Sequence, residues 1–300
     1  MFDILIIGSG PSGMTSAIYG ARSGLTVGII ERGAPGGAMV TTASIENYPG
    51  FSKIDGATLS MNMFEQMTNL GVTFIGEEVL SIKKDNDIFT VETNYAKYDS
   101  KTVIIATGTM QKKLSVSGED KFTGRGISWC AICDGSFYKG KDVIVVGGGN
   151  SALEEAMYLA SICKTVYIIH RRDEFRADSM LVNKAKEFDN IKYILSSTIK
   201  EFLGDKKLEK VLITNLKTNE DYLMDIDGVF EFIGQTPNTN WLSELGIVGE
   251  NGFIKVNSEF ETTVKGLFAC GDVIDKGVRQ IATAVSDGAI SALSASHYIK

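Results

Sequence analysis

The residues with the clearest chemical meaning form a short run, Cys130-Ala131-Ile132-Cys133-Asp134. Two thiols at this spacing can close a reversible disulfide, in which one thiol exchanges with a partner and the other resolves the mixed disulfide. Asp134 follows directly and can give a proton to a departing thiolate or take one from a thiol. The run therefore predicts thiol–disulfide redox chemistry, with Cys130, Cys133 and Asp134 as catalytic residues.

Two other interpretations of these thiols are a structural zinc half-site and inert buried cysteines. A zinc site needs more ligands, and the sequence has no second CxxC and no HxxxH pair, its two histidines being His170 and His297. We therefore predict no metal site. The other two cysteines, Cys163 on a helix and Cys270 on a core strand, are expected to be small packed residues.

A glycine pattern with a second kind of chemistry occurs twice. The apolar run 2–7 leads into Gly8-Ser9-Gly10-Pro11-Ser12-Gly13, and the run 143–146 leads into Gly147-Gly148-Gly149-Asn150-Ser151-Ala152. In both copies a helical pattern follows, and then a second strand. GxGxxG between a strand and a helix is typical of a dinucleotide site, because it lets the backbone approach a pyrophosphate at the helix N-terminus. The alternative is a pair of glycine-rich turns in a generic α/β sheet, which the repetition in register disfavours.

The ends of the two second strands differ in charge. Glu31 ends the first; its carboxylate suits a ribose diol and repels a 2′-phosphate. His170 stands as far after Gly147 as Glu31 does after Gly8, and it is followed by Arg171, Arg172 and Arg176, whose guanidinium groups suit a phosphate. A solvated basic patch is the alternative. Two such sites indicate a flavoprotein that takes a hydride from NADPH.

Two further strand patterns indicate how the domains are arranged. The run 103–108 would close the first nucleotide domain, and the run 266–272, far along the chain, has the character of the same site. We therefore expect an α/β protein with two Rossmann-like, three-layer (ββα) domains, in which the NADPH domain is inserted into a split FAD domain. The expected boundaries are 1–111 and 243–300 for the FAD domain and 112–242 for the NADPH domain, which carries the dithiol.

Composition excludes several classes of protein. The chain has 300 residues, a formal net charge of -7, 44% hydrophobic and 22% charged residues. This balance disfavours binding to nucleic acid or to an anionic membrane, and no apolar run approaches the ~18 residues of a membrane span. With no signal peptide recognisable and only four cysteines, a cytoplasmic location is expected.

Taken together, these motifs resemble those of the low-molecular-weight, bacterial-type thioredoxin reductases, along essentially the whole chain. The most specific of them are the two glycine turns, the CAICDG run at 130–135, the HRRxxxR run at 170–176 and the RQIATA run at 279–284. The resemblance implies a homodimer with one FAD per chain and thioredoxin as the substrate protein. It also implies that Cys133 faces the flavin, that Cys130 attacks thioredoxin, and that Arg125 and Phe137 lie near the thioredoxin contact.

The motifs and the resemblance together predict the residues that bind each cofactor. Those expected at FAD are Gly8, Gly10, Pro11, Ser12, Gly13, Glu31, Arg32, Gly37, Asn47, Val79, Ala106, Thr107, Gly108, Gly271, Asp272, Arg279, Gln280 and Ile281. Those expected at NADPH are Gly147, Gly149, Asn150, Ser151, Ala152, His170, Arg171, Arg172, Arg176, Ile233 and Gly234.

The chain departs from the family pattern at one flavin-facing position. Where the family usually has Gly-Gly-Gln, this chain has Gly36-Gly37-Ala38, so one side-chain amide directed at the flavin is missing. The middle pair of the CxxC reads Ala-Ile where Ala-Thr is commoner. We expect an altered flavin affinity or potential, with binding retained.

The expected cycle passes a hydride from NADPH to FAD, then electrons to the Cys130–Cys133 disulfide, and then to thioredoxin. Because the dithiol and the nicotinamide site share the inserted domain and both need one flavin, that domain is expected to rotate about segments near 111–116 and 240–245. Two alternatives stay open. One is an NADPH-dependent flavoprotein that reduces another thioredoxin-like or small disulfide partner, and the other is a non-catalytic redox sensor.

Overall fold

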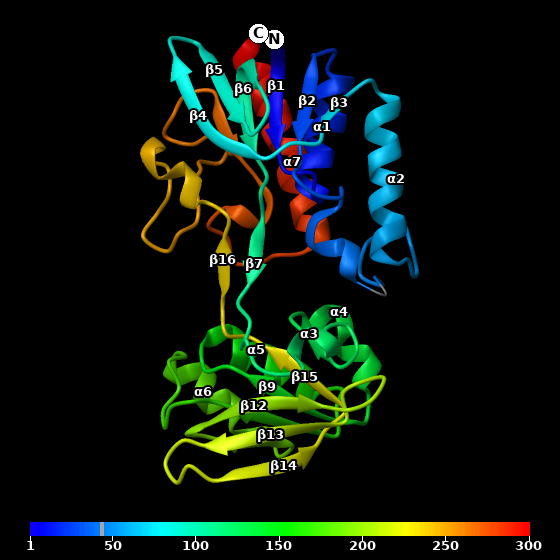
Figure 1. Ribbon diagram of the computed structural model, residues 1–300, viewed down its shortest axis with the longest axis vertical. Helices are drawn as coiled ribbons and strands as arrows, with labels where there is room; N and C mark the ends of the chain where they lie inside the picture. The colour runs from blue at the N-terminus through cyan, green and yellow to red at the C-terminus, as the bar shows by residue number, and fades with distance from the viewer. Residues whose placement is uncertain (43–44) are drawn as a thin grey trace. The chain divides into compact units, whose positions relative to one another are not determined.

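The computed structural model describes residues 1–42 and 45–300. The chain folds into two compact units (Figure 1), the first made of Met1–Met110 with Thr236–Lys300 and the second of Gln111–Gln235. Each unit is built on a mostly parallel sheet with helices, so the expected α/β class with one nucleotide-binding-type unit inserted in another is confirmed. Within the described residues, no helix combines the length and the apolar character needed to cross a bilayer.

The first unit has one seven-stranded sheet in the order β3-β2-β1-β6-β5-β4, with β17 paired to β6. The strands β1, β2, β3, β6 and β17 pair with one another in parallel, whereas β4 and β5 continue the sheet from β6 as an antiparallel meander. Its elements are β1 (Phe2–Ile7), α1 (Pro11–Arg22), β2 (Val27–Ile30), the 3₁₀ helix η1 (Gly37–Thr41), α2 (Gly56–Asn69), β3 (Thr73–Ile75), β4 (Val79–Asp85), β5 (Ile88–Thr93), β6 (Lys97–Ile105), η3 (Asn240–Leu245), β17 (Leu267–Ala269), η4 (Gly271–Val273) and α7 (Ile281–Ile299).

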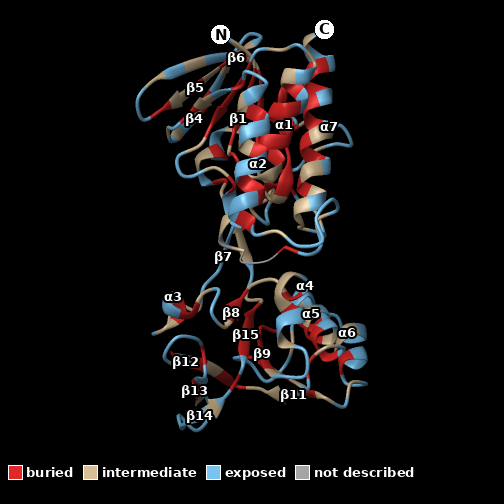
Figure 2. Cartoon of the chain, turned by 90° about the vertical axis from the view of Figure 1, so that its right-hand side faces the viewer, coloured by how far each residue is buried: buried red, intermediate tan, exposed pale blue. Residues whose placement is uncertain are grey.

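Two hydrophobic cores cover the two faces of this sheet. Successive strand residues point to opposite faces, so Ile4 and Ile6 join the core beneath α1, α2 and α7, while Leu5 and Ile7 join the core shared with β4, β5 and the segment around η3. Figure 2 shows α1, α2 and α7 on one side of the parallel strands β1 and β6, and β4 and β5 on the other side. This is the predicted three-layer arrangement.

The second unit repeats the plan on a smaller scale. Its parallel sheet runs β11-β10-β9-β15-β8, and a separate antiparallel sheet runs β12-β13-β14. Its elements are α3 (Glu119–Phe122), β8 (Ile127–Ser128), α4 (Ala131–Asp134), the 3₁₀ helix η2 (Gly135–Tyr138), β9 (Asp142–Val146), α5 (Asn150–Ala160), β10 (Thr165–Ile169), α6 (Ser179–Ala185), β11 (Ile191–Ile194), β12 (Ser197–Leu203), β13 (Lys210–Asn215), β14 (Asp221–Asp225) and β15 (Gly228–Glu231).

The same alternation fills the two cores of the second unit. Val143 and Val145 of β9 pack with α5 and α6, whereas Ile144 and Val146 pack with residues of the antiparallel sheet. The spare cysteines are buried as expected, but Cys163 lies in the turn after α5 and not on a helix.

Two short strands connect the units. They are β7 (Thr109–Gln111) and β16 (Gln235–Pro237), which pair with each other. The return crossing therefore precedes the boundary at 242 and the hinge segment 240–245 that we expected from the sequence. The physical reason is Leu242, which is fully buried in a core of the first unit with residues such as Leu5 and Val103.

Replacing Leu242 by alanine is expected to destabilise the protein by about 2–5 kcal/mol, because the change leaves a cavity in a packed core. Leu223→Ala, on the exposed face of β14, is the control and should change the stability by no more than about 0.5 kcal/mol. Urea unfolding followed by circular dichroism measures both. Equal midpoints for the two variants would mean that residues 240–245 do not stabilise the first unit.

Candidate functional site

The first glycine turn is held by close backbone contacts. Gly8 has φ +102°, and a Cβ on it would lie 2.5 Å from the carbonyl oxygen of Ala106. A Cβ on Gly13 would overlap the Gly8 carbonyl oxygen. The two predicted glycines of this turn thus meet the distant predicted residue Ala106 at the end of β1, where only glycine at positions 8 and 13 allows this packing.

The N-terminus of α1 is bare. Gly10 is the N-cap residue and makes no side-chain capping bond, Pro11 opens the helix, and a Cβ on Gly10 would touch nothing. A Cβ on Gly37, by contrast, would lie 3.2 Å from the Cα of Gly10, so η1 begins beside this turn. Free N–H groups at a positive helix end, with open space before them, suit a pyrophosphate.

Glu31 is fixed at the end of β2 by three hydrogen bonds. Its Oε2 accepts from the backbone N and the Oγ of Ser9, at 2.9 and 3.1 Å, and its Oε1 accepts from the backbone N of Gly33 at 3.0 Å. The predicted ribose-binding carboxylate therefore stands next to the glycine turn. Arg32 is exposed and pairs with Glu78 at 3.3 Å.

Other expected flavin residues lie around this turn or apart from it. Val79 directly follows Glu78 on β4 and packs against the core on the meander side. Thr107 Oγ1 donates to the carbonyl of Asn238 at 3.2 Å, and Gly108 has φ +63°. The predicted role of Val79 at the flavin depends on the resemblance alone.

The C-terminal part of the first unit also contacts the first glycine turn. A Cβ on Gly271 would overlap the Ser12 hydroxyl, which brings these two predicted residues together. Asp272 follows; its buried Oδ1 lies 3.6 Å from the Lys276 ammonium and, within the described chain, accepts no hydrogen bond. Burial raises the pKa of Asp272, and the charges of Lys276 and Arg279 oppose that shift. A buried acceptor with unused capacity indicates that a polar ligand group belongs there.

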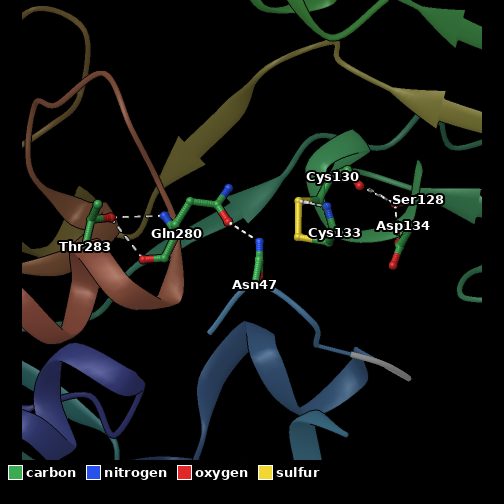
Figure 3. Close-up of a disulfide and its surroundings, with 7 residues drawn as sticks. All are labelled: Asn47, Ser128, Cys130, Cys133, Asp134, Gln280 and Thr283. Carbon is green, nitrogen blue, oxygen red and sulfur yellow. Dashed lines mark hydrogen bonds between the residues drawn. A yellow bond between two sulfur atoms is a disulfide. The ribbon is translucent and has the colours of Figure 1, made fainter. Parts of the chain in front are cut away.

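The start of α7 carries a capping box. Gln280 N donates to Thr283 Oγ1 at 3.1 Å, and Gln280 Oε1 accepts from Asn47 Nδ2 at 3.1 Å (Figure 3). Arg279 stacks on the Phe253 ring at 4.4 Å and bonds the carbonyl of Asp272 at 3.4 Å. The predicted residues Asn47, Gln280 and Ile281 thus share one end of α7.

The second glycine turn reproduces the first. Gly147 has φ +154°, and a Cβ on it would lie 2.6 Å from the carbonyl oxygen of Phe232 and 2.7 Å from the Cβ of Ala152. Gly149 is the N-cap of α5, again without a side-chain cap and with open space around it. Ile233 and Gly234 come directly after Phe232, at the same edge of the sheet.

The residues after β10 differ from their counterparts in the first copy. His170 is buried, stacks on Phe175 with ring centroids 5.6 Å apart, and its ring occupies the space that a Cβ on Gly148 would need. Burial lowers the pKa of His170, and three nearby arginines lower it further. His170 therefore favours the neutral form and packs against the second glycine turn at Gly148. Arg171, Arg172 and Arg176 are exposed, and no ion pair holds them within residues 1–42 and 45–300.

The helix that opens at this turn is tied to the next one. Asn150 Nδ2 donates to Asp178 Oδ2 at 2.8 Å, and Asn150 Oδ1 accepts from the backbone N of Asp178 at 2.9 Å. Ser151 is exposed. The Asn150 side chain thus holds the segment after β10 and does not cap its own helix.

Cys130 and Cys133 form a disulfide at the start of α4 (Figure 3), with Cα atoms 5.3 Å apart. Cys130 is the N-cap of this short helix, and both cysteines are half-buried. Ser128 Oγ donates to Asp134 Oδ2 at 2.6 Å and accepts from the backbone N of Cys130 at 3.1 Å. Ser128 therefore connects the predicted acid to the backbone of Cys130.

Burial raises the pKa of Asp134, and the Ser128 hydroxyl opposes that shift. The group therefore keeps a proton to higher pH than an exposed carboxyl does. Nearby Tyr138 is also buried, and this, with the charge of Asp134, raises its pKa to about 12. Asp134 is thus the acid with a raised pKa on the dithiol helix itself, as a proton donor at this site requires.

Apolar side chains are exposed around the dithiol. Ile132, between the cysteines, is 44% exposed, and Phe137 is 42% exposed. Arg125 is exposed before β8, and its backbone N donates to the carbonyl of Phe122. Exposed apolar residues beside a reactive disulfide are suited to a protein partner.

Four residues at these sites were missed from the sequence. Ser9 and Ser128 bind the predicted carboxylates, while Lys276 and Asp287 form an ion pair at 2.6 Å beside Asp272. Asp287 also accepts from the backbone N of Gly271 at 3.2 Å. A serine next to a glycine or two residues before a cysteine has no distinctive pattern, and Lys276 and Asp287 meet only through the fold.

Comparison with known proteins agrees with this geometry. Residues 2–288 match the family model described as pyridine nucleotide-disulphide oxidoreductase. The chain belongs to this family, among the thioredoxin reductases. It is 42% identical to the thioredoxin reductase of Bacillus subtilis (strain 168), over 100% of this chain and 95% of that one, and 43% identical to that of Mycoplasma genitalium, over 98% and 94%. It matches the crystal structure of thioredoxin reductase from Streptococcus pyogenes MGAS5005 with a TM-score of 0.95 and 46% identity, over 99% and 98%.

The family membership confirms the resemblance inferred from the motifs. The chain is therefore an oxidoreductase of the disulfide-reducing type, and the Cys130–Cys133 disulfide is where such chemistry belongs.

Ser128→Ala is expected to raise the pKa of Asp134 further, because the hydroxyl favours the charged carboxylate. The midpoint of a carbon-13 NMR titration of the Asp134 carboxyl should therefore move to higher pH. Ser136→Ala, an exposed serine on η2, is the matched control and should leave the midpoint in place. A midpoint unchanged or lowered in Ser128→Ala would contradict the role given to this hydroxyl.

Proposed function

We propose that this protein is an NADPH-dependent, FAD-containing thioredoxin-disulfide reductase. The observation that carries the proposal is the Cys130–Cys133 disulfide, on the same unit as a glycine turn followed by three unpaired arginines. The relatives named thioredoxin reductase match the chain over nearly its full length, which supports thioredoxin as the partner.

The residues around the first turn fit FAD. The bare end of α1 suits the pyrophosphate, Glu31 the adenosine ribose, and Asp272 with its unsatisfied oxygen the polar chain of the flavin half. The α7 terminus, with Gln280 and Arg279, stands where a helix dipole would favour negative charge on a reduced ring. Bound FAD would accept a hydride from NADPH and supply two electrons to the disulfide.

The chain's own residues then handle thiols and protons. Reduction of the disulfide takes two electrons and, for two neutral thiols, two protons. Asp134 holds a proton next to the dithiol, and Ser128 fixes its carboxyl. We assign Cys133 to the flavin and Cys130 to thioredoxin: the Cys130 thiolate forms a mixed disulfide, and Cys133 then displaces reduced thioredoxin and restores the Cys130–Cys133 bond.

NADPH is proposed to bind at the second turn. The pyrophosphate would lie at the end of α5 by Gly149, and the 2′-phosphate would pair with Arg171, Arg172 and Arg176. Neutral His170 would close the site from the sheet side. Ile233 and Gly234, past β15, are proposed to line the same edge.

We also propose that the inserted unit rotates between half-reactions. The dithiol and the nicotinamide site belong to this one unit, and each must reach a single flavin held by the other unit. The crossings β7 and β16 supply two short connections at which rotation can occur. We propose that Met1–Met110 with Thr236–Lys300 bind FAD and that Gln111–Gln235 bind NADPH. The sequence places the return at 242, but the packing of Leu242 assigns that residue to the first unit.

The remaining features of the proposal concern partners and location. Ile132, Phe137 and Arg125 are proposed to contact thioredoxin. A homodimer follows from the resemblance alone. The net charge of -7 supports a protein that binds neither nucleic acid nor an anionic membrane, and a reducing cytoplasm would provide its thiol chemistry.

The central prediction is that the yellow protein catalyses NADPH-dependent reduction of a chromogenic disulfide only when thioredoxin is added. Cys130→Ser and Cys133→Ser should each abolish this turnover, while Cys163→Ser, a buried thiol outside the site, should retain it. Flavin reduction by NADPH should persist in all three. Turnover without thioredoxin would favour the alternative of a small-disulfide reductase, and flavin reduction with no turnover would favour the redox sensor.

Arg171→Ala and Arg172→Ala are expected to raise the KM for NADPH by about 10- to 100-fold, the loss expected for a charge-assisted hydrogen bond of ~1.5–3 kcal/mol. The KM for NADH should change less than about twofold, since NADH has no 2′-phosphate. Lys186→Ala, an exposed cation of the same unit, is the control in the same steady-state assays. An equal rise for both nucleotides would remove the argument for NADPH.

A further inference from the structure

A buried acid lies under the segment that carries the dithiol, on the opposite side of the sheet from α5. Glu231 ends β15 and is only 1% exposed. In the parallel pairing of β15 with β8, Val229 faces Ile127 and Phe230 faces Ser128. The next residues of the two strands are Glu231 and Trp129, so these two side chains are neighbours on the sheet.

The side chain of Glu231 points into an apolar core. Strand residues alternate between faces, and Val229 packs with Ile144 and Ile127 in the core between the two sheets of the second unit. Glu231 is on the same face as Val229, and Trp129 also packs against this core. A carboxyl group there is shielded from water (Figure 2 colours β8, β9 and β15 as buried).

A second buried acid completes the group. Glu119, at 2% exposure, accepts hydrogen bonds from the backbone N of Leu114 at 3.1 Å, of Ser115 at 2.6 Å and of Val116 at 3.3 Å. Ser115 has φ +59°, which the three bonds to one carboxylate help to stabilise. Both oxygens of Glu119 are therefore acceptors, and three backbone N–H groups fix the position of this carboxyl.

Glu231 has the opposite environment. Within the described chain, both carboxylate oxygens of Glu231 and the Nε1 of Trp129 are buried and have no hydrogen-bond partner. Burial raises the pKa of Glu231 to about 8; the charge of Glu119 adds to this shift, and Trp129 opposes it. Lys113, which pairs with Asp120 at 2.6 Å, is the nearby cation. The raised pKa favours the neutral form of Glu231, which has one O–H to donate and acceptor capacity left.

These groups match one another. A protonated carboxyl can donate to the Glu119 carboxylate and accept from the Trp129 indole N–H, and the terminal torsion of a Glu side chain is soft enough to form both bonds. We propose that Glu231 is a positioning residue for the dithiol, linking the Glu119 carboxylate to Trp129 and so fixing the residue that precedes Cys130. The inference rests on the proposed function, in which Cys130 is the attacking thiol.

The consequence for the site follows from the chain order. In this proposal Glu231 binds the Trp129 indole. The preceding residue, Ser128, binds Asp134 and the backbone of Cys130. Cys130 is the N-cap residue of α4. Glu119, the other acid of the pair, binds the backbone N–H groups of residues 114–116, the first segment of the inserted unit after β7. In this proposal, the hydrogen bond from Glu231 connects that segment to the base of the disulfide.

Glu231→Gln and Glu231→Leu test the proposal. Infrared spectra of the purified holoenzyme at pH 7 should contain a protonated-carboxyl C=O band that Glu231→Gln lacks. Glu220→Gln, an exposed glutamate in the β13–β14 turn, is the matched control and should keep the band. An unchanged band in Glu231→Gln would overturn the proposal, whether or not the leucine variant folds.

Positioning is read from two further measurements. In a Trp241→Phe background Trp129 is the one tryptophan left, and acrylamide quenching of its fluorescence should rise in Glu231→Leu but not in Glu231→Gln, because glutamine can still donate and accept. The rate at which chemically reduced protein reduces a small aromatic disulfide should fall about tenfold in Glu231→Leu and stay within about twofold in Glu231→Gln. Wild-type quenching and rate in Glu231→Leu would overturn the positioning role. Neither measurement needs NADPH or thioredoxin, so a failure of the proposed function would be seen separately.

Discussion

The architecture of both units depends on one steric constraint, the contact of a strand-end glycine with the backbone of a neighbouring strand just before a helix begins. Gly8 meets the carbonyl of Ala106, and Gly147 meets that of Phe232. A side chain at either position would push the turn away from the sheet edge. The contact leaves the N-termini of α1 and α5 without side-chain caps, so free backbone N–H groups are the common element of the two proposed ligand sites.

On this shared scaffold, charge separates the two sites. The first turn has a carboxylate held by Ser9, and the second has a neutral, buried histidine beside exposed guanidinium groups. The inserted unit also places different chemistry on the two faces of one sheet. The disulfide and Asp134 lie on α4, whose Ala131 packs with α5, whereas the acid pair Glu119 and Glu231 lies in the core toward the antiparallel sheet. Ser128 and Trp129 are consecutive at the end of β8. Ser128 bonds Asp134 on the α4 side, and Trp129 packs against the core on the other side.

Much of this arrangement follows from local sequence pattern. The glycine turns, the strands beside them and the dithiol could be predicted because each is a short pattern with one steric or chemical reason. What could not be predicted depends on burial and on contacts between distant segments. From the sequence, Glu231 is indistinguishable from an exposed residue at the end of a strand, yet it is buried. The predicted boundary assigns Leu242 to the segment that connects the two domains, yet it belongs to a core of the first unit. Arg32 and Val79 are both expected at the flavin. That expectation does not indicate the contacts they make, which are an ion pair of Arg32 with Glu78 and the packing of Val79 against a core of the first unit.

The split of the first unit has a consequence for how the chain is made. The inserted unit is continuous, from Gln111 to Gln235, and can complete its own sheets as soon as it leaves the ribosome. The first unit must wait, because β17 and α7, which cover the free side of β6 and the apolar face of α1, come from the last part of the chain. At ~5–20 residues per second of translation this delay lasts on the order of ten seconds. During that interval the strands of residues 1–110 have an unpaired edge. We therefore expect chaperones to act on nascent chains of this protein chiefly at these early residues.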